Sequence, residues 1–325
     1  MLSARTRHPA TLERLARAPE TATADGIDWL TPIDRARWYF CETLTPLYYT
    51  PVYDEIAPEH RRRYNQLTGM LANEVIALLE TQFLHAALRA VESGIGQDAE
   101  LRAAVLRFRD DERRHAEIWR RLNCLSEPEW YSKARFHLVR VPPAAAVLSR
   151  VVARHPVAFP VVFWIQLVQE ERSVEFSRRC MRMPADRIEP RYAAAYAAHI
   201  HDEVRHVQID RHLIERFYAC RSTAVRRATA RLFRWIVGSM LLTPVHSSMR
   251  VVERLTTEYP DLKPLLPRIR RELYGLAHHD EYHQMMYSRK TTPVTFSLFD
   301  RFEEFHQMRR VLRAYRPHPV AWRQP

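Results

Sequence analysis

The stretch HIHDEVRH, residues 199–206, places three histidines, an aspartate and a glutamate within little more than two helical turns. An earlier stretch, DDERRH at residues 110–115, resembles its second half, because Glu112 and His115 are spaced like Glu203 and His206. Residues three apart lie on one face of a helix, since about 3.6 residues complete a turn. Two Glu-x-x-His pairs, each within an Asp-Glu-x-Arg-His segment, therefore predict two helices that present metal ligands.

The helix faces that carry these pairs are otherwise largely apolar. The first face includes Leu101, Val105, Phe108, Trp119 and Leu122, and the second includes Tyr192, Tyr196, Leu213 and Phe217. Such faces are expected to point into the core. A buried carboxylate without a partner costs several kcal/mol, so a cation is expected to meet these glutamates.

Each of the two helices is expected to be the second half of an antiparallel hairpin. Long helices are predicted over 58–92 and 98–123, joined by SGIGQD at 93–98 with Asp98 as a possible cap, and over 160–181 and 191–221, joined by RMPADRIEP at 182–190. Residues equally distant from such a connection face each other. Glu80 lies opposite Glu112 by this rule.

Two adjacent glutamates, Glu170 and Glu171, compete for the place opposite Glu203. The face of Glu170 is mostly apolar, whereas the face of Glu171 continues through charged Glu175 and Arg178, so Glu170 is selected. Glu80 then precedes Glu112 by 32 residues, and Glu170 precedes Glu203 by 33. This internal repeat predicts an all-α four-helix bundle with a dinuclear metal site between its carboxylates, together with additional flanking helices.

His199 is a candidate for a seventh ligand. It lies four residues before Glu203 on the same inward face, where the first hairpin has Phe108. The alternative is a core histidine that only forms hydrogen bonds. His201 points away from this face and is not expected to be a ligand. The predicted metal ligands are thus Glu80, Glu112, His115, Glu170, His199, Glu203 and His206.

Asp111 and Asp202 each precede a ligand glutamate. We expect them to accept the free imidazole N–H of a metal-bound histidine, and surface charges are the alternative. Carboxylates with imidazoles suit two iron ions, with manganese possible on loading, and this arrangement suits activation of dioxygen. The stretch HHDEYH at 278–283 lacks the spacing of a ligand pair and is read as a polar cluster.

Composition limits the remaining interpretations. The chain has 325 residues, six glycines and a net charge of +12, without the pattern of a nucleic-acid-binding module. Four scattered cysteines, and the lack of a signal-like or membrane-spanning apolar stretch, lead us to expect a cytoplasmic protein. We expect a polar, weakly ordered arm over 1–30, a single helical domain over 31–315 with its bundle at 58–221, about three helices over 222–315, and an irregular tail over 316–325.

The sequence resembles the p-aminobenzoate N-oxygenase family of diiron enzymes, which belongs to the ferritin-like superfamily. The resemblance is carried by LTGMLANEVIALLETQ (67–82), DERRH (111–115), LVQEE (167–171) and HIHDEVRH (199–206), within residues 40–220. It implies that Glu80, and not Glu74, is a ligand, and that Glu170, His199, Glu203 and His206 are ligands too. It also implies oxidation of an amine to a hydroxylamine, nitroso or nitro product through a peroxo-diiron species, with an external electron donor, in secondary-metabolite biosynthesis.

Substrate assignments do not carry over, because residues 222–325 show no match to the family pattern. The expected partners are a small-molecule amine and an electron-donor reductase. The basic surface could attract the amine if it bears a carboxylate or is tethered to an acidic carrier protein. Whether the protein forms a homodimer stays open. Two rival functions are another diiron oxidation, such as C–H hydroxylation, desaturation or radical generation, and a non-catalytic protein that stores metal or binds an anionic polymer.

Overall fold

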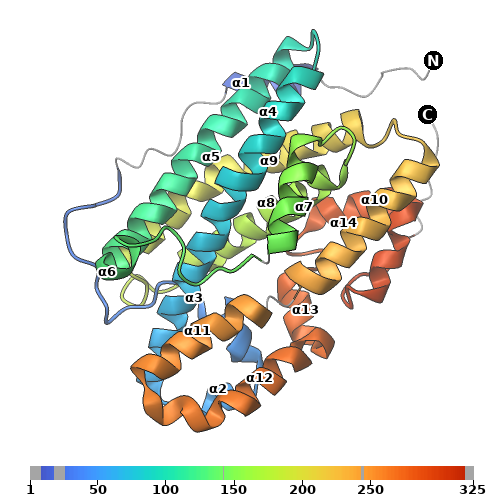
Figure 1. Ribbon diagram of the computed structural model, residues 1–325. Coiled ribbons are helices and arrows are strands. Elements are labelled where there is room, and N and C mark those ends of the chain that lie inside the picture. The colour runs from blue at the N-terminus through green and yellow to red at the C-terminus, as the bar shows by residue number, and fades with distance from the viewer. Residues whose placement is uncertain (1–8, 18–25, 142, 243–244, 319–325) are drawn as a thin grey trace.

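Four long helical stretches form the centre of the molecule (Figure 1). The computed structural model describes residues 9–17, 26–141, 143–242 and 245–318. Within them the bundle consists of α3 (Pro58–Leu78) continued by η4 (Leu79–Leu84) and α4 (His85–Gly94), α5 (Ala99–Ser126), α8 (Val161–Met181) and α9 (Pro190–Phe217). The described residues contain no strand, apart from one isolated bridge between Trp38 and Ile188. The predicted all-α four-helix bundle is confirmed.

The ends of the bundle helices follow from local sequence. The Asp98 carboxylate accepts a hydrogen bond from the Leu101 N–H at 3.2 Å, as the predicted cap of α5. Helices α3 and α9 both begin at a proline. Proline has no backbone N–H group, and the first N–H of a helix has no acceptor within the helix, so proline is well suited to this position. The Glu189 side chain accepts hydrogen bonds from the first N–H groups of α9. These signals set the two hairpins close to their predicted bounds.

The first hairpin departs from a regular helix at η4, which is a turn of π-helix. The wider turn holds an additional residue and changes which side chains face the bundle interior, and such turns are frequent at functional sites. Glu80 lies at the second position of this turn and is buried. The predicted helix over 58–92 is therefore continuous but not uniform.

The aromatic-rich stretch before α3 lies against the bundle. It forms η2 (Glu42–Leu44), η3 (Pro46–Tyr49) and α2 (Val52–Glu55). The Asn65 amide accepts hydrogen bonds from the N–H groups of Tyr39 and Phe40, each at 3.1 Å, and donates to the Phe40 carbonyl at 2.8 Å. A Cβ atom at Gly69 would lie 3.1 Å from the Tyr39 Cβ, so this close approach favours glycine.

The expectation of a weakly ordered arm over 1–30 is wrong for residues 9–17. They form α1 (Pro9–Arg17), whose Leu12 and Leu15 side chains are buried where the helix packs on α5 and α9. Two leucines three residues apart supply the apolar face that orders this segment. Residues 1–8 and 18–25 of the expected arm lie outside the described residues.

Helices that flank the bundle are more numerous than the three predicted over 222–315. They are α10 (Thr223–Ile236), η5 (Val237–Leu241), α11 (Val245–Glu258), η6 (Pro260–Leu265), α12 (Leu266–Gly275), η7 (Leu276–His278), α13 (Asp280–Met286), α14 (Pro293–Arg301) and η8 (Glu303–Arg310). Prolines begin two of these elements, so the segment is divided into short helices. The short α6 (Pro128–Tyr131) and α7 (Pro143–Arg154) lie between α5 and α8.

The C-terminal elements cover the bundle from outside. Helix α11 packs on α3, and α10 and α14 pack on α8 (Figure 1). The Trp164 ring of α8 contacts the rings of Phe305 and Phe299, with centroids 4.0 and 5.8 Å away. Residues 316–318 of the predicted irregular tail have no regular structure, and residues 319–325 lie outside the described residues.

Candidate metal centre

All seven predicted ligands are buried in the interior of the bundle. They come from every bundle helix: Glu80 from η4, Glu112 and His115 from α5, Glu170 from α8, and His199, Glu203 and His206 from α9. His201, which was not expected to be a ligand, is exposed on the opposite side of α9. The amphipathic pattern of each helix explains this burial, because the acids and histidines share faces with core residues.

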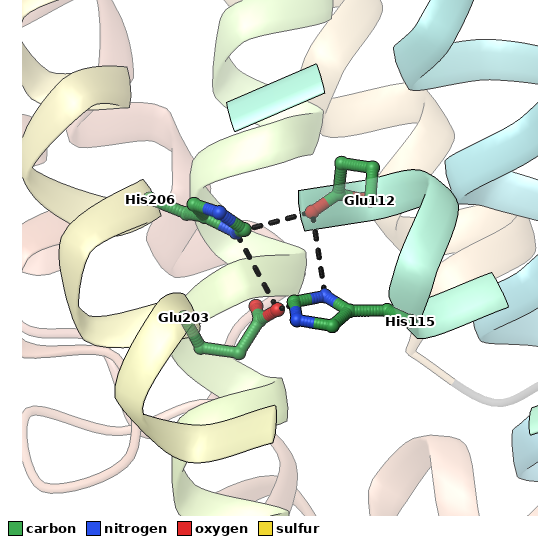
Figure 2. Close-up of side chains that lie close together, drawn as sticks. All are labelled: Glu112, His115, Glu203 and His206. Atoms are coloured by element: carbon green, nitrogen blue, oxygen red, sulfur yellow. Dashed lines mark ion pairs between the residues drawn. The ribbon is translucent and has the colours of Figure 1, made fainter. Parts of the chain in front are cut away.

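The two Glu-x-x-His pairs face each other across the interior (Figure 2). The Nδ1 atom of His206 lies 3.1 Å from Glu112 Oε1, and the Nδ1 atom of His115 lies 3.3 Å from Glu203 Oε1. One donor atom from each of the four residues falls within 4.8 Å of the others. Each histidine is therefore closer to the glutamate of the other helix than to its own.

A second group consists of Glu80, His115 and His199. His199 Nε2 lies 2.8 Å from Glu203 Oε1 and 3.6 Å from Glu80 Oε1. His199 therefore points into the same interior as the other predicted ligands. In the first hairpin, Phe108 instead stacks on the His206 ring with centroids 3.8 Å apart.

Glu170 is at the margin of the cluster. It belongs to neither group of four or three donors, and its Oε2 atom lies 3.8 Å from His206 Nδ1. Glu80 lies near His199 and His115, whereas Glu170 lies near His206. If the centre holds two ions, Glu80 would serve one of them and Glu170 the other.

Several buried polar atoms of this cluster have no hydrogen-bond partner of acceptable geometry. They are Glu80 Oε2, Glu112 Oε1, His115 Nδ1, His199 Nε2, both carboxylate oxygens of Glu203, and His206 Nδ1. Buried polar atoms in proteins are nearly always paired, so a concentration of unpaired donors and acceptors needs an explanation. Carboxylate oxygens together with imidazole nitrogens suit iron or manganese. The residues present fit a pair of metal ions.

The two aspartates lie directly behind the histidines. Asp202 Oδ2 lies 3.1 Å from His115 Nε2, and Asp111 Oδ2 lies 3.3 Å from His206 Nε2. Each aspartate thus contacts the histidine of the other helix, not the one four residues ahead of it. A proton on Nε2 donated to the aspartate leaves the Nδ1 lone pair directed at the cluster, which is the tautomer that a metal needs.

Arg205 joins these two aspartates. Its guanidinium donates to Asp111 and, at 2.7 Å, to Asp202, and the side chain is buried. The corresponding arginine of the first hairpin, Arg114, bonds Asp111 and is about one-third exposed. Arg205 was not among the predicted functional residues, although the repeated Asp-Glu-x-Arg-His segment contained the signal.

Burial and mutual repulsion perturb the acids of the cluster. Burial, with repulsion from Glu112, raises the pKa of Glu80 to about 7, and burial with repulsion from Glu203 raises the pKa of Glu170. Burial alone would raise the pKa of Glu203 as well, but His199 and the neighbouring donors hold it well below its ordinary value. Burial would lower the pKa of His115, but Asp202 and Glu203 raise it to about 10. Bound cations would take the place of these protons.

The two glutamates that were not chosen as ligands have other partners. Glu74 accepts hydrogen bonds from the Tyr131 hydroxyl and from the backbone N–H groups of residues 137–139. Glu171 accepts hydrogen bonds from the N–H groups of Val294 and Thr295, at the start of α14. Both therefore fasten outer segments to the bundle.

The HHDEYH segment (278–283) contributes to neither group of candidate ligands. His278 and Glu281 are exposed, as a polar cluster predicts, but His283 is buried and its Nε2 atom bonds the Ala277 carbonyl at 2.9 Å. The expectation of a polar surface is therefore wrong for His283. Tyr282 and Met286 of the same helix are also buried, so His283 lies on the side of this helix that faces the core.

Comparison with known protein families identifies the family of the chain. The family model described as P-aminobenzoate N-oxygenase AurF matches residues 5–261, which include both hairpins and all seven buried residues. The match is longer than the expected 40–220, and the expectation that the family pattern is absent after residue 222 is wrong for residues 222–261. No curated protein matches the sequence. Among the described helices, none combines the length and the apolar character needed to cross a membrane. With most of its length covered by this match, the chain belongs to the p-aminobenzoate N-oxygenase family.

Proposed function

We propose that this protein is a non-haem diiron oxygenase that uses dioxygen to oxidise the nitrogen of a small-molecule amine. The observation that carries the proposal is the convergence of two Glu-x-x-His pairs and a third histidine, His199, in the buried interior of a family member. The product would be a hydroxylamine, nitroso or nitro compound.

The seven buried side chains would hold the metals, with Glu80 serving one ion and Glu170 the other. Two iron ions at this place would supply the activation of dioxygen, with electrons from an external donor. Asp111 and Asp202 would keep His115 and His206 in the tautomer that presents Nδ1 to the metals. The bundle walls would exclude water and favour a neutral amine, which is the form with a free electron pair on nitrogen.

The partners follow from the same chemistry. An amine substrate and an electron-donor reductase are required, and a net charge of +12 would favour a carboxylate-bearing substrate or an acidic carrier protein that presents it. Association with such a partner should weaken as salt screens the charges. Binding that is independent of ionic strength would argue against this part of the proposal.

Metal analysis and product analysis test the function. The purified protein should hold about two irons per chain, as a dinuclear site of this kind does. After reduction and exposure to ¹⁸O-labelled dioxygen, the oxidised amine should contain ¹⁸O bonded to its nitrogen. Label on carbon would favour another diiron oxidation. Less than one metal per chain after iron loading would favour a non-catalytic helical protein.

A further inference from the structure

Two fully buried polar side chains near the proposed metal centre have no partners. Asp210 lies on α9, one turn after His206, and neither of its carboxylate oxygens has a hydrogen-bond partner. Gln166 lies on α8, one turn before Glu170, and neither atom of its amide has a partner. A helical turn advances about 5.4 Å, so each of the two residues lies about 5 Å along its helix from a proposed metal ligand. This distance is comparable to the size of a small organic molecule.

Both side chains lie on the same side of the metal centre along the bundle. Helices α8 and α9 are antiparallel, with Glu170 beside His206 and, further along, Phe163 stacked on Phe217 at 5.6 Å. The two unpartnered residues fall between these contacts on their respective helices. They therefore occupy one level of the bundle, next to the level of the metals.

Asp210 is directed towards the bundle interior. It follows Glu203 by seven residues, which is close to two full turns, so both side chains share one face of α9. The charges that act on its carboxyl group are those of His206, Glu112 and Glu203 in the proposed metal centre, and that of Glu171. Burial is the largest influence on this carboxyl group, and it raises the pKa of Asp210 well above the ordinary value.

Asp210 stands apart from the other buried acids. Among the described residues, every buried carboxylate outside the seven proposed ligands has a bonded donor, with this one exception; the others are Glu74, Asp111, Glu127, Glu171, Glu175, Glu189 and Asp202. Burying a carboxyl group without a donor destabilises a protein, so such a residue is kept where a ligand completes it.

We propose that Asp210 accepts a hydrogen bond from the amino group of the substrate, and that Gln166 binds a second polar atom of the same molecule. This inference rests on the proposed function and adds the residues that select the substrate. The substrate class is then an amine that retains at least one N–H and carries a further polar group. A tertiary amine has no N–H in its neutral form and would not satisfy Asp210.

Binding measurements without turnover test this assignment. The protein is loaded with Zn²⁺, which has no redox chemistry. Calorimetry then compares amines with isosteres in which a methyl group replaces the amino group: aniline with toluene, p-aminobenzoate with p-methylbenzoate, and benzylamine with ethylbenzene. The wild-type protein should bind at least one amine about tenfold more tightly than its isostere, as expected for one hydrogen bond to a buried carboxyl group.

Substitutions then locate the effect. Asp210→Leu should remove the preference for the amine, keep the metal content and, without substrate, melt at the same or a higher temperature, because an unpaired buried acid is gone. Gln166→Leu should weaken binding of p-aminobenzoate and p-methylbenzoate, which both carry a second polar group, and leave the preference for the amine over its isostere. Asp186→Asn, in an exposed connection, is the matched control and should behave as the wild type.

Three results would overturn the assignment: no amine is preferred by the wild type, Asp210→Leu keeps the preference because a buried water satisfies the acid, or Asp210→Leu loses metal. Amine oxidation by the iron-loaded wild type is measured separately. An iron-loaded protein that oxidises amines while Asp210→Leu retains full selectivity would refute this inference alone. Absence of amine oxidation would refute the proposed function.

Discussion

The two hairpins of the bundle carry the same ligand pattern but differ around it. Both present a glutamate and then a Glu-x-x-His pair, and both bury these side chains. The second hairpin adds His199 where the first has Phe108, and its arginine is buried where that of the first is partly exposed. The first hairpin instead contains the π-helical turn that carries Glu80. A repeated sequence thus produces a paired set of proposed ligands whose two halves are not equivalent.

The largest difference between the hairpins is expected when the central glutamate of each is replaced and metal binding is measured. Glu203 lies within 3.5 Å of His115, His199 and His206, whereas Glu112 lies within 3.8 Å of only the first and last of these. We expect Glu203→Ala to abolish binding of both metals, and Glu112→Ala to leave residual binding. Metal analysis after dialysis measures this. Equal retention in both variants would show that the hairpins are equivalent.

The third histidine sharpens the difference. His199→Ala should lower the affinity for one of the two metals by about 10- to 100-fold or more, because one ligand is lost from one ion only. Titration of the metal-free protein with Fe²⁺ should then show one strong and one weak site. His201→Ala, an exposed residue on the same helix, is the control. Unchanged amine oxidation and unchanged metal binding in His199→Ala would leave it as an ordinary core histidine.

The corresponding arginines predict a difference in stability. Arg205→Met removes the buried cation that contacts both Asp111 and Asp202 and should cost about 3 kcal/mol, the range seen when one partner of a buried ion pair is removed. Arg114→Met should cost less than about 1 kcal/mol, because this side chain is partly exposed to solvent. Urea unfolding of the metal-free proteins compares the two. Similar losses would contradict the role given to Arg205.

The non-ligand glutamate of the second hairpin predicts a pH-dependent effect. Burial raises the pKa of Glu171 to about 7, against the donors of Val294 and Thr295. A carboxyl group with a raised folded-state pKa contributes stability that is present below its unfolded value near 4.5 and is lost as pH rises to about 7. Glu171→Gln should remove about 3 kcal/mol of this dependence, since one pKa unit corresponds to about 1.4 kcal/mol. Melting temperatures between pH 4.5 and 7.5 that decline equally in both proteins would contradict it.

Much of the fold and the ligand set could be read from residue spacing. The positions of Glu112, His115, Glu203 and His206 on helix faces follow from periodicity, and Glu80 and Glu170 follow from the symmetry of a hairpin around its connection. Metal binding by these residues stays a prediction. The order of α1 was not foreseen, because two leucines in a charged segment are too weak a signal without the surface on which they pack.

The sequence by itself determined the helices, their paired connections and the face on which each acid and histidine lies, because these depend on neighbours only a few residues apart. Only the tertiary structure decided that each aspartate contacts the histidine of the opposite helix, that Arg205 bridges the two, and that Asp210 and Gln166 have no partner. The contacts among these aspartates, histidines and Arg205 join two helices, α5 and α9, whose contacting residues are nearly a hundred positions apart in the sequence. They depend on the rotation and height of one helix against another, which local sequence does not specify.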